Sequence, residues 1–360
     1  MSSPVQRNPL RPPETADLRA PATVALRPRA AEVLREVVDA YLRSGEPVGS
    51  QIIAEHAAGH MSAATARVVL SELADQGLLS QPHTSAGRVP TERGLRVYVS
   101  ALMRTRPPSP RARGEIDAVL RSAGPRPNDI LRAASEHLAD RCELAALARR
   151  PRVDALRIEG LRLVAIGGGR VLAVAIFADA VVRHRVLESD AGADELERVQ
   201  NLFARELAGL TVAQARERLH GELEAGLDAR TRALGEQALP EADPPDEAVF
   251  VCGRTHIVDR APSPEQLGDL LRVLDDKRRL RDLLDDLVAA DGVQVLLGDD
   301  AAAHGLRVCS VVAAPYFVGA RPGGTVGIVG PLRMEYARVI PLVTYTAQAI
   351  SGILRGADAA

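Results

Sequence analysis

The sequence is poor in aromatic residues. It contains no tryptophan, and aromatic side chains make up only 2% of its 360 residues. Its hydrophobic fraction is nevertheless 46%, so buried cores must be built mainly from Ala, Val and Leu. A chain of this length is expected to form two or three domains, each with a core of its own.

Lysine is almost absent as well. Lys277 is the one lysine, and the other 44 of the 45 basic residues are arginine. With the high alanine content, this bias indicates genomic codon usage, so arginine richness alone is no argument for nucleic-acid binding. The formal net charge of −2 also differs from that of a histone-like binder. Residues 25–106 hold ten Arg against eight Asp and Glu, a net +2, so any basic surface there must arise by folding and dimerisation.

Cysteines are few. Cys142, Cys252 and Cys309 are odd in number and lack C-x-x-C spacing, which fits a reducing cytoplasm. No basic start followed by an apolar run is present, so we expect a cytoplasmic protein without a signal peptide. The apolar stretch 171–182 is interrupted by an aspartate and is too short to span a bilayer. Residues 1–24 are polar and proline-rich and are expected to be disordered.

No residue pattern in the chain is typical of an enzyme. The run Gly167-Gly168-Gly169 has no following helix and no Gly-Lys-Ser/Thr, which favours a hairpin turn over a phosphate loop. His56 and His60 have helical spacing, but a glycine intervenes and no third metal ligand is evident. Asp275-Asp276 and Asp285-Asp286 are interpreted as solvated helix faces. No Ser/His/Asp order with a nucleophile elbow occurs, and we expect no reaction, metal or cofactor.

The segment from Pro28 to Gly77 predicts three short helices. The apolar residues of the first recur at the spacing of a helix buried on one face. Ser50 is a candidate N-cap of the second helix and Ser62 of the third, which Gly77 terminates. The inner stripe of the third helix consists of Ala66, Val69, Leu70 and Leu73.

A strand, a polar tip and a return strand follow the third helix. Leu78–Ser80 and Arg88-Val89 bracket the tip, and Thr91 then caps another helix. Three helices followed by a hairpin are typical of a winged helix-turn-helix, which presents one helix and one loop to DNA. The residues expected to contact DNA are Ser62, Thr65, Arg67, Val68, His83, Thr84, Ser85, Gly87 and Arg88.

The chemistry of these positions suits a DNA surface. The Thr65 hydroxyl can bond to a base or a phosphate, and the fork of Arg67 to guanine or phosphate. Gly87 would let the tip approach the phosphate backbone closely. The alternative is that these residues are ordinary solvated polar side chains. The three-helix pattern by itself is also nonspecific, because many protein-interaction modules share it.

Longer motifs make a family resemblance specific. EPVGS and GLLSQPHTSAGRVPTERG resemble the heat-inducible transcription repressor HrcA family. The resemblance extends from about Pro28 to Leu354 and includes GLRLVAIGGGRVLAVAIFADAVVRHRVLE, VFVCGRTHIV, SVVAAPY and VGIVGPLRMEYARVI. It implies an α+β protein in which a winged helix-turn-helix precedes a GAF-like α/β domain with an inserted dimerisation domain. Arg333, Glu335 and Tyr336 of GPLRMEY are interpreted as a strand-to-helix junction rather than as catalytic groups.

The resemblance also implies a function. It indicates a repressor of chaperone operons that binds an inverted-repeat operator as a homodimer and is released on heat shock. The chaperonin GroEL is the implied partner that helps to maintain the active fold. The alternative is a ligand-responsive winged-helix regulator of a metabolic operon, because a GAF-like cavity can hold a small molecule. The helices around Leu196–Leu210 and Leu267–Leu287 are candidates for the dimer contact.

One departure from the family pattern concerns the third helix. The family typically has Thr-Ile-Arg-Asn followed by an acid, whereas this chain has Thr65-Ala66-Arg67-Val68-Val69. An asparagine can make a bidentate contact to adenine, while Val68 can only touch a thymine methyl group or pack. The operator sequence is therefore expected to differ from the family's usual one.

These observations predict a division of the chain. The predicted segments are a winged-helix domain at 25–103, a linker at 104–114, a GAF-like domain at 115–192 and 291–356, and an inserted dimerisation domain at 193–290. Within them we expect helices over Ile130–Leu147 and Leu267–Leu287 and a strand over Val249–Val258.

Overall fold

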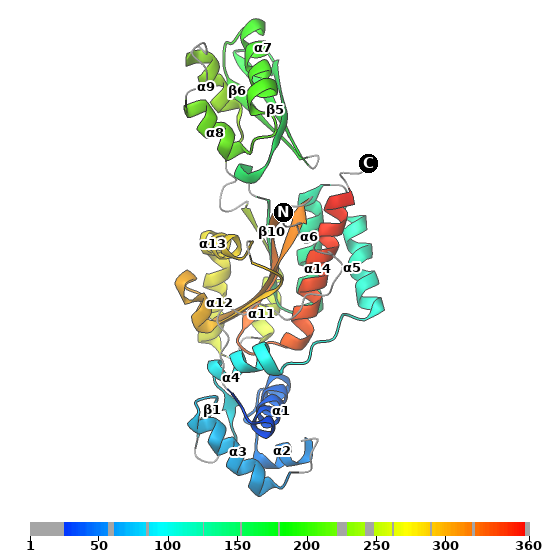
Figure 1. Ribbon diagram of the computed structural model, residues 1–360, viewed down its shortest axis with the longest axis vertical. Coiled ribbons are helices and arrows are strands. Elements are labelled where there is room, and N and C mark those ends of the chain that lie inside the picture. Colours follow the sequence, from blue (N-terminus) through cyan, green and yellow to red (C-terminus); the bar gives the residue numbers. More distant parts are fainter. Residues whose placement is uncertain are drawn as a thin grey trace, which may run out of the picture.

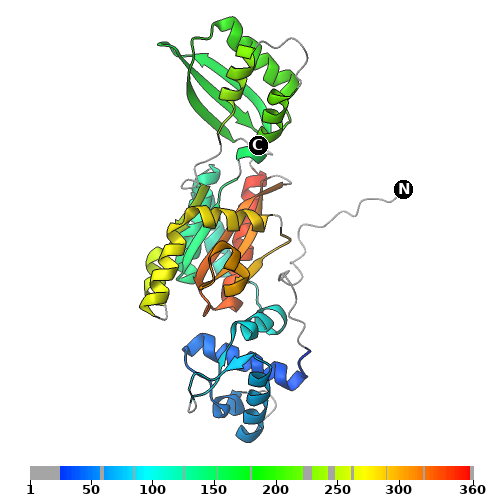
Figure 2. The same ribbon diagram turned by 90° about the vertical axis from the view of Figure 1, so that its left-hand side faces the viewer.

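The molecule consists of three units that follow one another along its long axis (Figures 1 and 2). The computed structural model describes residues 25–56, 61–83, 86–124, 126–151, 153–178, 181–221, 229–241, 248–260, 263–288, 290–318 and 321–356. We call the units the N-terminal unit (25–102), the central unit (110–151 with 248–356) and the inserted unit (153–241). The predicted disordered tail at 1–24 lies outside the described residues.

The N-terminal unit has the element order that the sequence predicts. It consists of α1 (Pro28–Ser44), α2 (Ser50–His56), α3 (Ala63–Asp75), β1 (Leu79–Ser80), β2 (Val89–Pro90), α4 (Glu92–Val97) and the π-helical turn η1 (Tyr98–Leu102). Gly45 ends α1 in the left-handed conformation with φ 77°, and Gly77 follows α3 with φ 69°. The Thr91 side chain caps α4 by accepting the Gly94 N–H at 3.1 Å, as predicted.

The central unit is an antiparallel five-stranded sheet between two layers of helices. The strand order is β7-β3-β10-β9-β8, with β3 (Ala145–Arg149), β7 (Val249–Cys252), β8 (Gln294–Leu297), β9 (Cys309–Val318) and β10 (Arg321–Pro331). One face packs on α5 (Pro110–Ser122), α6 (Pro127–Cys142) and α14 (Tyr336–Gly356). The other packs on α11 (Arg254–Arg260), α12 (Pro264–Asp275) and α13 (Lys277–Val288). Because both faces are covered, all five residues of β3 are buried.

The inserted unit is a separate antiparallel sheet with helices on one face. Its strands are β4 (Ile158–Ala165), β5 (Arg170–Phe177) and β6 (Val182–Glu188), in the order β4-β5-β6. The turn Gly167-Gly168-Gly169 joins β4 to β5 with φ values of 80°, 61° and 67°, which favour glycine. The covering helices are α7 (Ala193–Leu202), the π-helical η3 (Phe203–Leu207), α8 (Val212–His220) and α9 (Ala229–Ala238).

The structure divides the chain at other places than the predicted boundaries. The residues of β4, β5 and β6 lie within 115–192, which was expected to form one domain with 291–356, but these strands pair only with one another among the described strands. Their inner residues share a core with α7 to α9. Conversely, α11, α12 and α13 fall within the predicted insertion, yet they cover the central sheet. The inserted unit therefore runs over 153–241 rather than 193–290.

Two predicted helices are shorter than expected. The helix expected over 130–147 stops at Cys142, because Glu143 takes a left-handed conformation with φ 53° and the chain continues as β3. The helix expected over 267–287 is divided at Asp276. The carboxylate of Asp276 accepts the backbone N–H of Arg279 at 3.2 Å, so this residue ends α12 and caps α13.

A predicted strand and the predicted linker are also shorter. The strand expected over 249–258 ends after four residues, because Gly253 with φ 71° turns the chain into α11. The linker expected over 104–114 ends at Ser109, whose side chain accepts the Ala112 N–H at 3.2 Å and caps α5.

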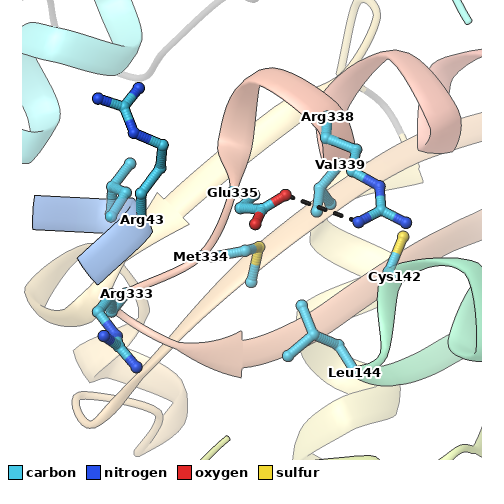
Figure 3. A pocket seen from close by; sticks show the side chains of 9 residues that line it. Arg43, Cys142, Leu144, Arg333, Met334, Glu335, Arg338 and Val339 are labelled. Carbon is cyan, nitrogen blue, oxygen red and sulfur yellow. Dashed lines mark ion pairs between the residues drawn. The ribbon is translucent and has the colours of Figure 1, made fainter. Parts of the chain in front are cut away.

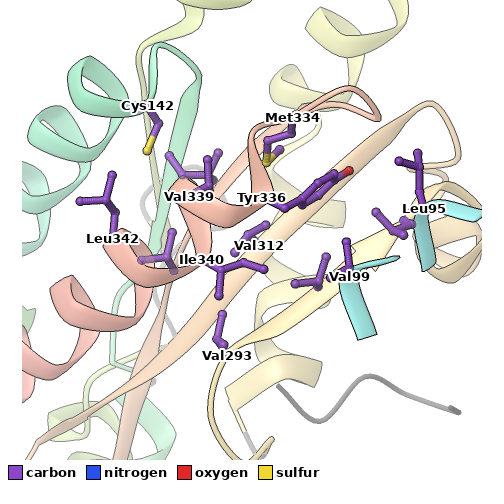
Figure 4. Packing of buried hydrophobic residues seen from close by; sticks show 14 of the residues in the cluster. Leu95, Val99, Cys142, Val293, Val312, Met334, Tyr336, Val339, Ile340 and Leu342 are labelled. Carbon is purple, nitrogen blue, oxygen red and sulfur yellow. The ribbon is translucent and has the colours of Figure 1, made fainter. Parts of the chain in front are cut away.

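One hydrophobic core joins the N-terminal unit to the central unit. It contains buried residues of α1, α3 and α4 together with residues of α5, α6, α14 and one face of the five-stranded sheet. At the junction Leu95 and Val99 lie near Tyr336, Ile340 and Val293 (Figure 4). Each of these five side chains is less than 10% exposed. The N-terminal unit is therefore packed onto the central unit through a shared core as well as joined to it by the chain.

A buried ion pair ties the central sheet to α13. The Nε of Arg149, at the end of β3, lies 2.8 Å from Oδ1 of Asp285. The Arg149 side chain is only 7% exposed and also donates to the carbonyls of Arg150 and Ala248. The prediction that Asp285 belongs to a solvated face is wrong, because its carboxylate neutralises a guanidinium in the core.

Asp285→Ala is expected to lower the free energy of unfolding by about 3 kcal/mol, because it leaves the Arg149 guanidinium buried without its carboxylate. The matched control is Asp275→Ala, which breaks an ion pair with Arg254 whose side chains are 66% and 42% exposed. That loss should stay below about 1 kcal/mol. Guanidinium unfolding of both variants measures the difference, and equal midpoints would contradict the role given to Asp285.

Candidate nucleic-acid interface

The outer surface of α3 presents the residues that the sequence predicts. Arg67 and Val68 are exposed, Val68 to 57%, while the inner stripe of α3 is buried. Figure 1 shows α3 at the end of the molecule opposite the inserted unit, with the β1–β2 hairpin beside it. Arg67 is the single basic residue of α3, which also carries Glu72 and Asp75. A contact between a positively charged side chain of α3 and a nucleic acid would therefore have to come from Arg67.

Ser62 and Thr65 form the N-terminal cap of α3. The Ser62 Oγ accepts the backbone N–H of Thr65 at 3.1 Å, which confirms Ser62 as the N-cap. The Thr65 hydroxyl lies 2.8 Å from the same oxygen. Each hydroxyl therefore already has one partner in the helix cap, and Thr65 is half-buried.

The tip of the hairpin is closed by hydrogen bonds. The side-chain amide of Gln81 donates to the carbonyl of Ala86 at 3.0 Å, and the N–H of Ala86 donates to the carbonyl of His83 at 2.9 Å. His83 is exposed at this tip. Thr84 and Ser85, which were predicted to contact DNA, lie outside the described residues.

The return strand of the hairpin is anchored to the segment between α1 and α2. Val48 and Arg88 exchange two backbone hydrogen bonds of 2.8 and 2.9 Å. A Cβ on Gly87 would come within 2.5 Å of the Val48 carbonyl. Gly87 therefore permits close approach to Val48 of the same chain, a role that the sequence did not predict.

The anchor at Val48 was not found from the sequence. Val48 and Gly49 stand within EPVGS, which was used only as a motif of the family resemblance. A single apolar residue between two helices is too short to show the alternation that predicts a strand. Val48 is 1% exposed, so it both fills the core and holds the hairpin. Arg88 itself is half-buried at the base of the hairpin.

The GPLRMEY segment is a structural junction, as predicted. The Tyr336 hydroxyl donates to the Leu332 carbonyl at 2.7 Å and lies 2.6 Å from the Ser310 Oγ, and burial raises its pKa above the usual range. The Arg333 guanidinium lies against Gly45, at the C-terminal end of α1, where a Cβ would collide with it. A positive charge is favourable at that end of a helix. Glu335 lies 3.6 Å from a guanidinium nitrogen of Arg338.

A cavity of about 70 Å³ lies between α1 and this segment (Figure 3). Its lining includes Arg43, Arg333 and Cys142, and Figure 3 shows the guanidinium groups of Arg43 and Arg333 pointing in different directions. Ligand pockets for drug-sized molecules enclose about 300–1,000 Å³, so this cavity is too small for such a ligand.

The thiols do not have the character of catalytic nucleophiles. Burial raises the pKa of the Cys142 and Cys309 thiols to about 12, and it also raises the pKa of Cys252. In the described ranges no cluster of three or more His, Cys, Asp or Glu could hold a metal ion. His60 lies outside those ranges, so the His56–His60 spacing is not placed. None of the helices in the described part of the chain is long and apolar enough to cross a membrane.

Comparison with known proteins agrees with the resemblance seen in the motifs. The family model "HrcA protein C terminal domain" matches residues 128–340. That range includes the whole inserted unit and most of the central unit. A solved structure described only as a hypothetical protein has a similar fold, with a TM-score of 0.58 and 22% identity. The match covers 92% of this chain and 99% of that one.

Full-length relatives extend the similarity to the N-terminal unit. The "Heat-inducible transcription repressor HrcA" of Xanthomonas campestris pv. campestris is 35% identical over 335 residues, which are 90% of this chain and 95% of the relative. The protein of the same name from Sorangium cellulosum is 36% identical over 336 residues, with 90% and 96% covered. These relatives are transcription repressors and not enzymes. The chain therefore belongs to the heat-inducible transcription repressor HrcA family.

Proposed function

We propose that the N-terminal unit is a winged helix-turn-helix with which this repressor binds the operators of chaperone genes. The observation that carries the proposal is the pairing of a capped helix and an anchored hairpin on one end of the molecule. Ser62 fixes the start of α3, and the Val48–Arg88 bridge holds the hairpin beside it. In this arrangement α3 enters the major groove with Arg67 and Val68 toward base edges, and the hairpin tip lies along the phosphate backbone.

The inserted unit supplies the proposed dimer contact. The face of its sheet that points away from α7 to α9 carries a row in which Val164 pairs with Leu172 and Leu172 with Val186. A second row pairs Ile176 with Val182. Val164, Val182 and Val186 are 51%, 54% and 52% exposed. Exposed rows of apolar side chains on a sheet favour association, and a second copy of the same face gives the two-fold symmetry that an inverted repeat requires.

The helices predicted to form the dimer contact have their apolar faces elsewhere. The apolar residues of α7 and η3 are buried against the inserted sheet, and those of α12 and α13 against the central sheet. Amphipathic periodicity identifies a buried face, but it does not say whether that face packs within the chain or on a partner. The sheet face is the better candidate because it remains exposed after the inserted unit has folded.

The exposed apolar sheet face of the inserted unit also accommodates the two properties that the family resemblance implies, release on heat shock and a chaperonin partner. A chain that loses its dimer contact exposes the apolar sheet face, which is the kind of surface that a chaperonin such as GroEL binds. The central unit is the proposed GAF-like domain, and it connects the dimer contact to the DNA-binding unit. Together these assignments give a repressor whose active form depends on folding and assembly.

A metabolite-responsive regulator is the second candidate. A cavity of about 520 Å³ lies between the start of α6 and β6, and Arg126, Asn128 and Arg183 contribute to its lining. Its volume is within the range of small-molecule sites. Transcript profiling of a deletion strain, with and without heat, separates the two candidates. Derepressed chaperone genes support the first, and a derepressed metabolic operon supports the second.

Val186→Asp is expected to convert the homodimer into a monomer at micromolar concentration, because it places a carboxylate in the apolar contact. The fold should be retained, since Val186 is 52% exposed within the chain. Val258→Asp is the matched control, because Val258 is 53% exposed on α11 in the central unit. Light scattering decides, and a dimer that survives Val186→Asp would rule out this sheet face.

Arg67→Ala is expected to weaken operator binding by about 1–3 kcal/mol, because it removes the one guanidinium that α3 presents. Arg121→Ala on α5 removes an exposed arginine from the central unit and should leave the affinity unchanged. Titration of labelled operator at two salt concentrations measures both the affinity and the salt slope. Unchanged binding by Arg67→Ala would mean that another face docks on DNA.

Val68→Asn is expected to change which operator is preferred, by about 1–3 kcal/mol per affected base pair. Asparagine offers a donor and an acceptor to adenine, while valine offers neither. The fold should lose little stability, because Val68 points outward. Selection of preferred sites from random DNA compares the two proteins, and identical sites would show that Val68 faces no base.

A further inference from the structure

An ion-pair network crosses the junction between the N-terminal and central units. Arg96 of α4 pairs through Nη2 with Glu92 of the same helix at 2.8 Å. Through Nη1 it pairs with Asp300, which lies in the 3-10 helix η4 (Gly298–His304) of the central unit. The three side chains are 19–25% exposed, so they are largely shielded from water.

Backbone N–H groups at the junction of β8 and η4 bind both carboxylates of this network. The N–H of Asp299 donates to Oε1 of Glu92 at 3.1 Å, and the N–H of Leu297 donates to Oδ2 of Asp300 at 3.1 Å. Gly298 approaches the Glu92 carboxylate so closely that a Cβ would collide with it. We call Glu92, Arg96, Asp300 and the Asp299 N–H the Arg96 latch.

The Arg96 latch can fix the orientation of the N-terminal unit on the central unit, which the neighbouring apolar contact cannot do. The contact of Leu95 and Val99 with the central unit is hydrophobic, and hydrophobic contacts are non-directional. Guanidinium–carboxylate and amide–carboxylate bonds depend on angle as well as distance. The Coulombic gain of a shielded ion pair is largely offset by desolvation, so the role assigned to this network is orientation rather than net stability.

The latch lies far from the proposed DNA surface. In Figure 1, α4 is at the side of the N-terminal unit that meets the central unit, while α3 is at the opposite side. A small rotation at α4 therefore moves α3 through an arc. In a two-fold dimer the same rotation occurs in both subunits, so it changes the separation of the two recognition helices.

We infer that Arg96 is a positioning residue for operator binding, which sets the spacing of the two recognition helices without touching DNA. The inference rests on the proposed function, namely a dimer that binds an inverted repeat. Binding of one half-site strengthens binding of the second only if the protein holds both helices at the spacing of the DNA. Loosening the latch should therefore weaken two-site binding and leave one-site binding unchanged.

The test uses full-length protein with Arg96→Ala, and separately Asp300→Asn, which removes a charge but keeps size and an acceptor oxygen for the Leu297 N–H. Arg307→Ala is the matched control, because Arg307 pairs with the neighbouring Asp299 at 3.2 Å in an ion pair that is 73% and 66% exposed. Each protein is titrated with three duplexes. These are the inverted repeat selected from random DNA by the wild type, a single half-site, and the repeat with one base pair inserted or deleted at its centre.

Both latch variants are expected to bind the full repeat about tenfold more weakly and the half-site with affinity within about twofold of wild type. They should also discriminate less than the wild type against the altered spacing, which a merely destabilised DNA-binding unit would not do. Arg307→Ala should behave as the wild type on all three duplexes.

Equal losses on the half-site and the full repeat would overturn the inference, because Arg96 would then act within the N-terminal unit. Wild-type affinity of both variants for the full repeat would overturn it as well. A wild-type protein that binds half-site and full repeat equally tightly would instead contradict the dimeric function on which the inference rests.

Discussion

The packing of the N-terminal unit onto the central unit is the constraint on which the rest of the molecule depends. Buried side chains run without interruption from α1 and α3, through Leu95 and Val99, to Tyr336 on α14. A winged helix on a free linker would bind half-sites in many orientations. The shared core holds the proposed winged helix against the central unit, and the role proposed for the Arg96 latch is to fix the orientation that the recognition helix inherits. In the proposed function, the packing of the central unit is therefore a condition for binding an operator of fixed geometry.

In the proposed function, this arrangement connects folding with repression. The surface proposed to meet DNA lies at one end of the molecule and the surface proposed to form the dimer at the other, with the central unit between them (Figure 2). Partial unfolding of the central unit would change the relative position and orientation of the two proposed surfaces without altering either surface. A repressor that responds to heat needs such an element, because the affinity of α3 for DNA alone does not report on the folding of the chain.

Local chemistry allowed much of the N-terminal unit to be predicted. The caps Ser62 and Thr91 and the terminating Gly77 depend on neighbouring residues, and each was found where the sequence predicts it. The limits of the inserted unit could not be predicted in the same way. Alternating apolar residues identify the strands from Ile158 to Glu188, but they do not say which sheet a strand joins.

The long-range contacts were beyond sequence reasoning for a related reason. Arg149 and Asp285 are 136 residues apart, and Arg96 and Asp300 are 204 residues apart. In a chain rich in Arg and Asp, nothing marks these residues as paired rather than solvated. Gly87 illustrates the same limit, because its small size serves an approach to Val48 that only the fold creates. Family resemblance gave the class of protein, whereas these contacts show how this chain holds its N-terminal unit.

The central claim is that the chain reads an inverted repeat with two α3 helices held at a fixed separation. Hydroxyl-radical footprinting of the full-length protein on a natural operator tests this claim most directly. Two protected patches are expected on one face of the duplex, related by a dyad and separated by a whole number of turns of about 10.5 base pairs. A single protected patch, or patches without dyad symmetry, would contradict it.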